Sequence, residues 1–279
     1  IELLGRPTED MTVVLTTYQS GRVIAEAAKA ANVTFDLAIM DEAHKTVGKT
    51  HKLFAHLLFD ENLKADRRIF MTATERQFMN RKSPDVVSMD DESEIYGERF
   101  YQLTFKQAME LDPPAISDYQ IATVNIASKK IRELWDENRY LRILYGDDLE
   151  EATQPLACGI ALEEAYQERG VTRAISFHRS ILRAKKFKEQ QEQLQKLLKK
   201  KSPIDVFHVS SKTSVSERQI ALREFESSDR SLMTNARCLT EGVDIPTVDC
   251  VLFADPKKSV VDIVQASGRA LRLAEGKDK

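Results

Sequence analysis

The chain has 279 residues, of which 42% are hydrophobic and 30% are charged, and its formal net charge is -3. This composition is typical of a globular protein, shows no low-complexity tract, and is large enough for two domains with a core each. The charge balance neither indicates nor excludes a nucleic-acid partner, because such binding depends on local patches.

Cysteine usage and hydropathy indicate the cellular compartment of the protein. Three cysteines, an odd number without paired metal-ligand spacing, indicate a reducing compartment. The sequence has no run of 18 apolar residues and no signal-peptide pattern, which predicts a cytoplasmic protein without a membrane partner. The first residues, IELLGRPTED, lack an initiator Met, and we expect the chain to be a segment of a longer protein.

Short apolar runs alternate with helical patterns in the first part of the chain. This alternation predicts a parallel sheet with helices on its faces. The Pro113-Pro114 pair cannot continue a helix, and it marks the predicted boundary between domains 1–112 and 113–279. Strands are predicted at 12–18, 35–40, 67–74 and 101–105, and helices at 21–31 and 52–63.

The second domain opens with a helix-rich stretch, 128–168, after which the strand–helix rhythm restarts. The pattern is again that of an α/β domain. Two similar domains in tandem are consistent with a cleft between them. The strands of this domain are predicted at 173–178, 204–210, 231–236 and 250–255.

Two adjacent carboxylates, Asp41 and Glu42, follow the apolar run 35–40. Open α/β sheets bind their ligands at the carboxyl ends of the strands, so the pair lies where a ligand is expected. One carboxylate there can hold Mg²⁺, and the next can orient or deprotonate a water for attack on a phosphoryl group. The pair therefore predicts a magnesium site.

Residues Gly48-Lys49-Thr50 match only the tail of a phosphate-binding loop. The full pattern, G-x-x-x-x-G-K-[ST], requires a glycine where this chain has Ala43, and acidic residues precede that position. The pattern occurs nowhere else in the sequence. We interpret 48–50 as a turn that leads into a helix near 51–58.

A second candidate site lies near the carboxyl terminus. Gln265, Gly268, Arg269 and Arg272 are spaced at i, i+3, i+4 and i+7, which places them on one face of a predicted helix. A row of polar side chains that ends in two arginines is suited to a helix face that contacts phosphate groups. The alternative is an exposed amphipathic helix whose arginines pair with carboxylates.

The turn-rich segment 234–249 lies upstream of this helix. Gly242 can take a positive φ or let the backbone approach a ligand. Asp244 can accept a hydrogen bond from a ribose hydroxyl, and Thr234 or Thr240 can donate one to a phosphate. A plain connection from a strand to a turn is the alternative.

Together these segments resemble motifs of the superfamily 2 helicases and translocases of the DEAD/DEAH kind. The sequence of residues 239–272 is most similar to the sequences of the branch that contains type I and type III restriction motor subunits. The matching motifs, in the family's order, are TTYQS (16–20), DEAH (41–44), TAT (72–74), ISFHRS (175–180), TEGVDIP (240–246) and QASGRALR (265–272).

The resemblance implies an α/β fold of two tandem RecA-like domains, with parallel sheets flanked by helices and the first domain truncated at its N-terminus. It implies an ATP-dependent helicase or translocase that acts on double-stranded DNA as part of a larger restriction or defence protein. Nuclease, methyltransferase or specificity partners would lie outside this segment. The implied cofactors are ATP and Mg²⁺.

The resemblance also assigns roles in the first domain. Asp41 binds Mg²⁺ beside Glu42, and Glu42 activates the attacking water. His44 couples the nucleotide state to the second domain, assisted by Thr72 and Thr74.

In the second domain, Gln265 approaches the γ-phosphate, and Arg269 and Arg272 reach it across the cleft. Arginines of this kind stabilise charge in phosphoryl transfer by about 10³- to 10⁵-fold in rate. Gly242 and Asp244 contact the nucleotide.

Hydroxyls and arginines near the strand ends can hold a nucleic-acid backbone without reading bases. For Tyr18 we favour core packing over base stacking, and His178 can equally be a buried, hydrogen-bonded histidine. The basic stretch 183–201 is interpreted as a solvated amphipathic helix with Phe187, Leu194 and Leu197 inward, with a DNA contact as the alternative. We call the nucleic acid along which the motor would move the track. The candidate residues for contact with it are Thr16, Thr17, His178, Arg179, Ser211, Thr234 and Thr240.

The sequence departs from the family in lacking the phosphate loop. We expect truncation rather than loss of catalysis, and we expect this segment alone to hydrolyse ATP poorly or not at all. A non-hydrolysing RecA-like scaffold that binds nucleic acid, and a helicase directed to RNA, remain as alternatives.

Overall fold

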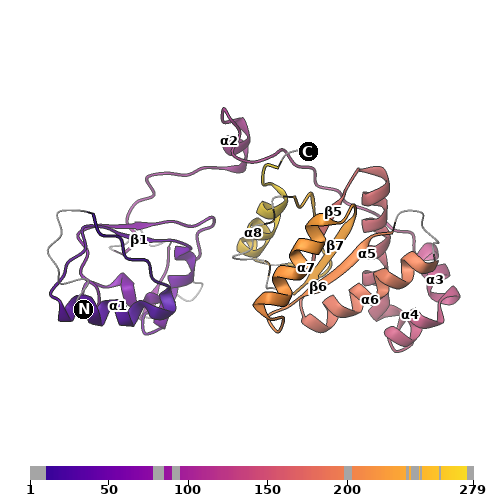
Figure 1. Cartoon of the computed structure of the whole chain (residues 1–279), viewed down its shortest axis with the longest axis horizontal. Coiled ribbons are helices and arrows are strands. Elements are labelled where there is room, and N and C mark those ends of the chain that lie inside the picture. The colour runs from indigo at the N-terminus through magenta and orange to yellow at the C-terminus, as the bar shows by residue number, and fades with distance from the viewer. Residues whose placement is uncertain are drawn as a thin grey trace. The chain divides into compact units, whose positions relative to one another are not determined.

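The computed structural model describes residues 11–77, 85–89, 95–197, 203–236, 239, 245, 247–257 and 259–274 (Figure 1). The chain divides into two compact units, Ile1–Gln102 and Leu103–Lys279. The boundary predicted at Pro113-Pro114 stays a prediction.

The first unit is built around a short parallel pair of strands. β1 and β3 pair in register from Ala38 opposite Arg68 to Met40 opposite Phe70. The alanine-rich α1 packs Ala25 and Ala28 against Met40 in a core that also contains Leu57. The elements of this unit are η1 (Tyr18–Ser20), α1 (Gly21–Ala30), β1 (Ala38–Met40), η2 (Ala43–Thr46), β2 (Gly48–Lys49), η3 (Leu53–Leu58), β3 (Arg68–Phe70) and β4 (Val86–Val87).

Two predicted strands are wrong. Residues 11–17 have no regular secondary structure, and no strand in the described part of the chain pairs with them. An extended segment becomes a strand only when a neighbour takes up its backbone hydrogen bonds. Residues 101–104 are irregular, and Phe105 begins α2, because Thr104 and Gln107 form a capping box that starts a helix there.

The segment 48–63 also differs from its prediction. Residues 48–49 are not a turn but strand β2, which pairs antiparallel with β4. The helix predicted at 52–63 is a short 3-10 helix, η3, that ends at Leu58 because Phe59 is extended. Arg68 then holds the following loop, since its guanidinium donates to the carbonyl oxygens of Leu57 and Leu63.

The second unit contains a four-stranded, fully parallel sheet in the order β6-β7-β5-β8. All four strands lie within the predicted ranges, because buried parallel strands read as continuous apolar runs. The elements of this unit are α2 (Phe105–Glu110), α3 (Ser128–Glu137), α4 (Arg139–Leu144), α5 (Leu149–Glu168), β5 (Arg173–Phe177), α6 (Ile181–Leu197), β6 (Asp205–Val209), α7 (Val215–Ser227), β7 (Ser231–Asn235), β8 (Cys250–Phe253) and α8 (Val260–Ala270).

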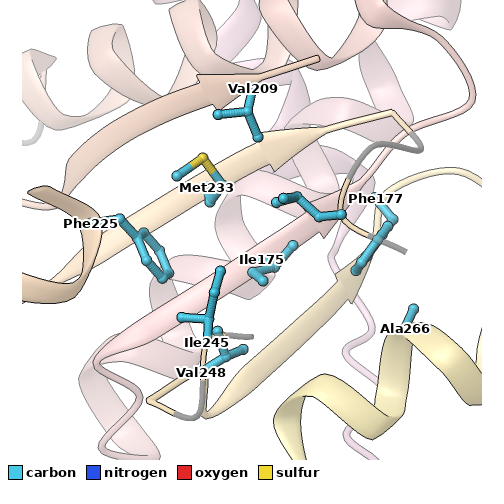
Figure 2. Close-up of a cluster of buried hydrophobic side chains, with 9 residues drawn as sticks. Ile175, Phe177, Val209, Phe225, Met233, Ile245, Val248 and Ala266 are labelled. Atoms are coloured by element: carbon cyan, nitrogen blue, oxygen red, sulfur yellow. The ribbon is translucent and has the colours of Figure 1, made fainter. Parts of the chain in front are cut away.

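Helices cover both faces of this sheet, and alternate residues of each strand point to opposite faces. On one face, Ile175, Phe177 and Met233 pack with Phe225 of α7 and Ala266 of α8 (Figure 2). The other face packs against α5 and α6, with Ala174 and Leu232 beside Leu162, Tyr166 and Phe187. This arrangement confirms the predicted α/β fold with a parallel sheet flanked by helices.

The helix-rich stretch forms α3, α4 and α5, which pack on α6 through a core that includes Trp135, Leu141 and Leu156. Gln190 of α6 fixes the α5–α6 contact: its amide donates to the carbonyl of Pro155 at 2.8 Å and accepts from the hydroxyl of Tyr145 at 2.6 Å. In the described part of the chain, no helix is long and apolar enough to cross a membrane.

Gly159 allows the close approach of α5 to α6, and we predict that Gly159→Ala destabilises the second unit. A Cβ at Gly159 would lie 2.8 Å from Nε2 of Gln190 and 2.5 Å from Nε2 of Gln191. Gln190 cannot move without losing its two hydrogen bonds, so the overpacking, about 1 to 3 kcal/mol, outweighs the helix propensity gained, about 1 kcal/mol. The free energy of unfolding from urea titration measures the difference.

Gly268→Ala in α8 is the matched control. A Cβ at Gly268 meets no described atom within 4 Å, so this substitution gains helix propensity without overpacking. Equal stability changes for the two alanine variants would contradict the close contact at Gly159.

Candidate functional site

The acidic motif lies at the carboxyl end of β1, next to the carboxyl end of β3. The parallel pairing continues past the strands: the backbone N–H of Met71 donates to the carbonyl of Met40 at 2.9 Å. The N–H of Ala43 donates to the carbonyl of Met71, also at 2.9 Å. These bonds join the Asp41–His44 loop to the loop that carries Thr72 and Thr74.

His44 connects the two loops through its side chain. Its Nδ1 lies 3.1 Å from Oγ1 of Thr72 and 3.2 Å from Oε2 of Glu42. The hydroxyl of Thr72 donates to the carbonyl of Thr74 at 2.9 Å, so Nδ1 of His44 is the donor toward Thr72. One buried imidazole therefore contacts both the Glu42 carboxylate and the Thr72–Thr74 turn.

The backbone at Glu42 is held in the left-handed region, with φ 50° and ψ 43°. Its N–H donates to Oδ1 of Asp41 at 2.8 Å. A non-glycine residue in this region costs on the order of 1 kcal/mol and persists where the surroundings require it. The turn connects β1 to η2.

Tyr18 supports the same loop from the preceding segment. Its hydroxyl donates to the carbonyl of Asp41 at 2.7 Å, and its ring packs 5.7 Å from that of Phe54. Burial, with the nearby Asp41 carboxylate, raises the pKa of Tyr18 to about 12. Tyr18 therefore packs in the core and positions the acidic loop, as the sequence favoured. Thr16 and Thr17 beside it are exposed, and Thr17 caps η1.

The donor set of this loop fits a hard divalent cation. Asp41 is exposed and Glu42 is partly exposed, and both offer carboxylate oxygens. Mg²⁺ typically binds through one or two carboxylates and keeps waters or phosphate oxygens for its other positions. Within the described ranges, no group of three or more His, Cys, Asp or Glu residues could hold a metal ion by itself.

In the second unit, polar residues collect at the carboxyl edge of the sheet. Arg179 follows β5 and is exposed, and Ser211 follows β6 and is also exposed. The parallel pairing of β5, β7 and β6 brings these strand ends to one edge. Thr234, by contrast, lies inside β7 with 0% exposure, and its hydroxyl donates to the carbonyl of Phe207.

His178 is a buried histidine with 3% exposure. Its Nε2 lies 2.9 Å from the hydroxyl of Ser176, and its ring packs 4.9 Å from that of Phe187. Burial lowers the pKa of His178 to about 4, although the Asp255 carboxylate acts in the opposite direction. The contact with the nucleic-acid track stays a prediction for His178 and for Thr234.

Sequence reasoning missed Asp255, which follows β8 and is 3% exposed. Its carboxylate accepts a hydrogen bond from the backbone N–H of Arg179 at 2.9 Å and from the guanidinium of Arg183 at 3.0 Å. It therefore fixes the turn that presents Arg179. The only signal in the sequence was an acid placed directly after an apolar run, the same signal that identified Asp41.

The basic stretch after Arg183 forms most of α6. Phe187 and Leu194 are buried, as the amphipathic interpretation predicts, whereas the side chain of Leu197 lies outside the described residues. Lys186 pairs with Glu151 at 3.1 Å and Lys188 with Glu192 at 3.5 Å.

The carboxyl-terminal stripe is only partly helical. Gln265, Gly268 and Arg269 lie in α8, and Arg269 is 6% exposed. Arg272 lies beyond the helix, because α8 ends at Ala270 and Leu271 is its C-cap, so the prediction of one helical face is wrong for Arg272. The carbonyl of Leu271 instead accepts the N–H of Ser117 at 2.8 Å. Predicted residues Thr240, Gly242 and Asp244 lie outside the described residues.

The fold and the order of these loops define the class of the second unit. Residues 160–274 match the family described as the helicase conserved C-terminal domain. This part of the chain is therefore similar to the conserved C-terminal domain of helicases.

Relatives extend the similarity to the rest of the chain. A probable helicase of African swine fever virus is 26% identical over 267 residues, which cover 93% of this chain and 26% of the viral protein. The putative ATP-dependent helicase IRC3 of Saccharomyces cerevisiae is 36% identical over 87 residues, 31% of this chain and 12% of the yeast protein. The chain thus spans about a quarter of the viral relative.

Two solved structures are similar in both sequence and fold. The ATP-dependent Type ISP restriction-modification enzyme LlaBIII bound to DNA is 31% identical with a TM-score of 0.71, covering 94% of this chain and 18% of that enzyme. A nuclease-deletion mutant of the Type ISP enzyme LlaGI in complex with a DNA substrate mimic is 28% identical with a TM-score of 0.55, covering 91% and 16%. The RecA-like fold of the chain matches the motor regions of restriction enzymes.

Because His178 is buried in its neutral form, we predict that the second unit loses stability in mild acid. The pKa of His178 is about 4 in the folded chain and about 6.5 when exposed, so the unfolded state alone binds the proton between these values. Stability therefore falls as pH drops from 7 to 5, by on the order of 2 kcal/mol from this residue.

Urea titrations of the wild type and of His178→Gln at pH 7 and pH 5 measure this contribution. The variant should lose less stability between the two pH values than the wild type. His208, whose pKa burial also lowers, is unchanged in both proteins and cancels in the comparison. An equal loss in the two proteins would contradict a neutral, buried His178.

Proposed function

We propose that this chain is the ATP-hydrolysing core of a motor that moves along double-stranded DNA, within a larger restriction or defence protein. The observation that carries the proposal is the contact of the buried His44 with both Glu42 and Thr72, which joins the carboxylate proposed as the base to a second loop. The 31% identity to an ATP-dependent restriction enzyme bound to DNA supports the choice of track.

Asp41 and Glu42 have different roles in the acidic loop. Asp41 would hold Mg²⁺, which when bound neutralises charge on the nucleotide phosphates. Glu42 orients the attacking water and accepts its proton, a role open to its partly exposed carboxylate. Nδ1 of His44 lies 3.2 Å from the Glu42 carboxylate and orients it for this role.

His44 and Thr72 connect hydrolysis to movement. A proton on Glu42 weakens the hydrogen bond that its carboxylate accepts from Nδ1 of His44, and the same nitrogen also contacts Thr72. The hydroxyl of Thr72 also fixes the turn at Thr74. The protonation state of the catalytic carboxylate thereby biases the conformation of a loop at the end of the next strand.

In the second unit, Gln265, Arg269 and Arg272 are assigned to the transferring phosphoryl group. Arginines in this role contribute about 10³- to 10⁵-fold in rate. Gly242 and Asp244 are assigned to the nucleotide.

We assign contact with the backbone of the nucleic-acid track to exposed hydroxyl and cationic side chains. Thr16 and Thr17 in the first unit and Arg179 and Ser211 in the second are exposed and suited to backbone phosphates. The carboxylate of Asp255 positions Arg179 for this contact. Thr240 is assigned to the same track.

Substitution of Glu42 tests the motor. We expect Glu42→Gln in the whole protein to lower ATP turnover by about 10²- to 10⁴-fold, because the amide cannot accept the proton. DNA binding should be retained, since the track residues are untouched. The measurement is phosphate release with and without duplex DNA.

Glu26→Gln in α1, an exposed carboxylate away from the acidic loop, is the matched control and should leave turnover unchanged. A protein that binds DNA but turns over no ATP before substitution would support the non-hydrolysing scaffold. Stimulation by duplex RNA in place of duplex DNA would redirect the motor to an RNA track.

A further inference from the structure

A polar hollow lies on the first unit, outside the acidic loop. It forms where the first turn of α1 meets the segment 50–62. Gly21 allows this close approach, since a Cβ there would already lie 3.0 Å from the side chain of Leu57. The next residue, Arg22, lines the hollow together with Thr50, His51 and Lys52.

The hollow is rich in cations and hydrogen-bond donors that the folded unit does not use. Arg22, His51 and Lys52 are exposed, and their side chains contact no hydrogen-bonding or ionic partner in the described part of the chain. His56 offers a second imidazole. Two full positive charges on long, uncommitted side chains are a suitable contact for a polyanion.

The acids in the same hollow oppose these cations only in part. Asp60 and Glu61 also line it. The carboxylate of Asp60 is paired with the guanidinium of Arg68 at 2.6 Å. Glu61 alone is then left to balance Arg22 and Lys52.

The geometry argues against a nucleotide in this hollow. A phosphate loop holds a nucleotide with successive backbone N–H groups that point into the loop. Here Gly48 and Lys49 belong to strand β2, and the N–H of Thr50 donates to the carbonyl of Asp85 at 2.8 Å. What remains for a ligand is a set of exposed side chains, the usual form of contact with a nucleic-acid backbone.

The position of the hollow is also informative. Arg22 is separated by Gly21 alone from the segment 16–20, whose threonines are assigned to the track. Thr17 caps η1, which leads directly into α1, so Thr17 and Arg22 lie on consecutive helical elements. The hollow is therefore adjacent in the chain to residues that we assign to the nucleic-acid track.

We propose that the hollow lined by Arg22, Thr50, His51 and Lys52 binds the phosphate backbone of the nucleic-acid track, beyond the motif at 16–20. This inference rests on the proposed function in one respect, that the partner is a nucleic acid. The contacts are made with phosphates and are independent of base sequence.

The double variant Arg22→Gln/Lys52→Gln tests the proposal. Binding of a labelled DNA duplex to the 279-residue chain is followed by fluorescence anisotropy, without ATP, across a series of salt concentrations. Each lost phosphate contact lowers the slope of log K against log salt by about 0.9, so the slope should fall by about 1 to 2. The loss should be equal for two duplexes of unrelated sequence.

Lys29→Gln/Lys64→Gln is the matched control, because it removes the same charge from exposed positions of the same unit outside the hollow. Equal slopes for the two double variants would overturn the proposal. Inorganic phosphate supplies a second arm: if it raises the melting temperature of the wild type but not of the hollow variant, while their DNA slopes agree, the hollow is a site for free phosphate.

The two hypotheses fail in different ways. A wild-type chain that binds no duplex at all would contradict the DNA track itself, and the hollow with it. A wild-type chain that binds duplex normally, with no effect of the hollow variant, would contradict this inference alone.

Discussion

Parallel strand pairing is the constraint on which both units depend. Parallel strands place all their carboxyl ends at one edge of a sheet, so residues distant in sequence meet there. In the first unit this pairing brings His44 within 3.1 Å of Thr72. In the second it brings the N–H of Arg179 within 2.9 Å of Asp255. The order of the strands in each sheet thus determines where each candidate site lies, and the side chains at that edge determine its chemistry.

Carboxylates connect β5 to β8 at both ends, one of them partly buried (Asp249) and the other buried (Asp255). At the amino end, Asp249 accepts hydrogen bonds from the N–H groups of Thr172 and Arg173 at 2.8 and 3.0 Å. At the carboxyl end, Asp255 accepts the N–H of Arg179. Hydrogen bonds to charged groups contribute about 1.5 to 3 kcal/mol each, so these two acids fix the register on which the turn at Arg179 depends.

The sequence predicted the strands of the second unit more accurately than those of the first. The strands of the second unit were found within their ranges because helices bury both faces, which makes each strand a continuous apolar run. The same reasoning failed at 12–18 in the first unit, where the apolar pattern has no partner strand in the described part of the chain. It also failed at 101–105, at the boundary between the units, where the capping box of Thr104 starts a helix. A pattern in sequence predicts the tendency to extend, whereas a strand needs a neighbour.

The sequence by itself determined the α/β class, the ordered set of motifs and the acidic pair at the end of β1, because these follow from local hydropathy and from residues adjacent in the chain. Only the tertiary structure decided that His178 is buried, that Arg272 lies beyond its helix, and that Asp255 positions Arg179. It also decided that Lys52 shares a hollow with Arg22. These facts depend on which segments pack together, and burial and proximity between distant segments leave no signal in a single local pattern.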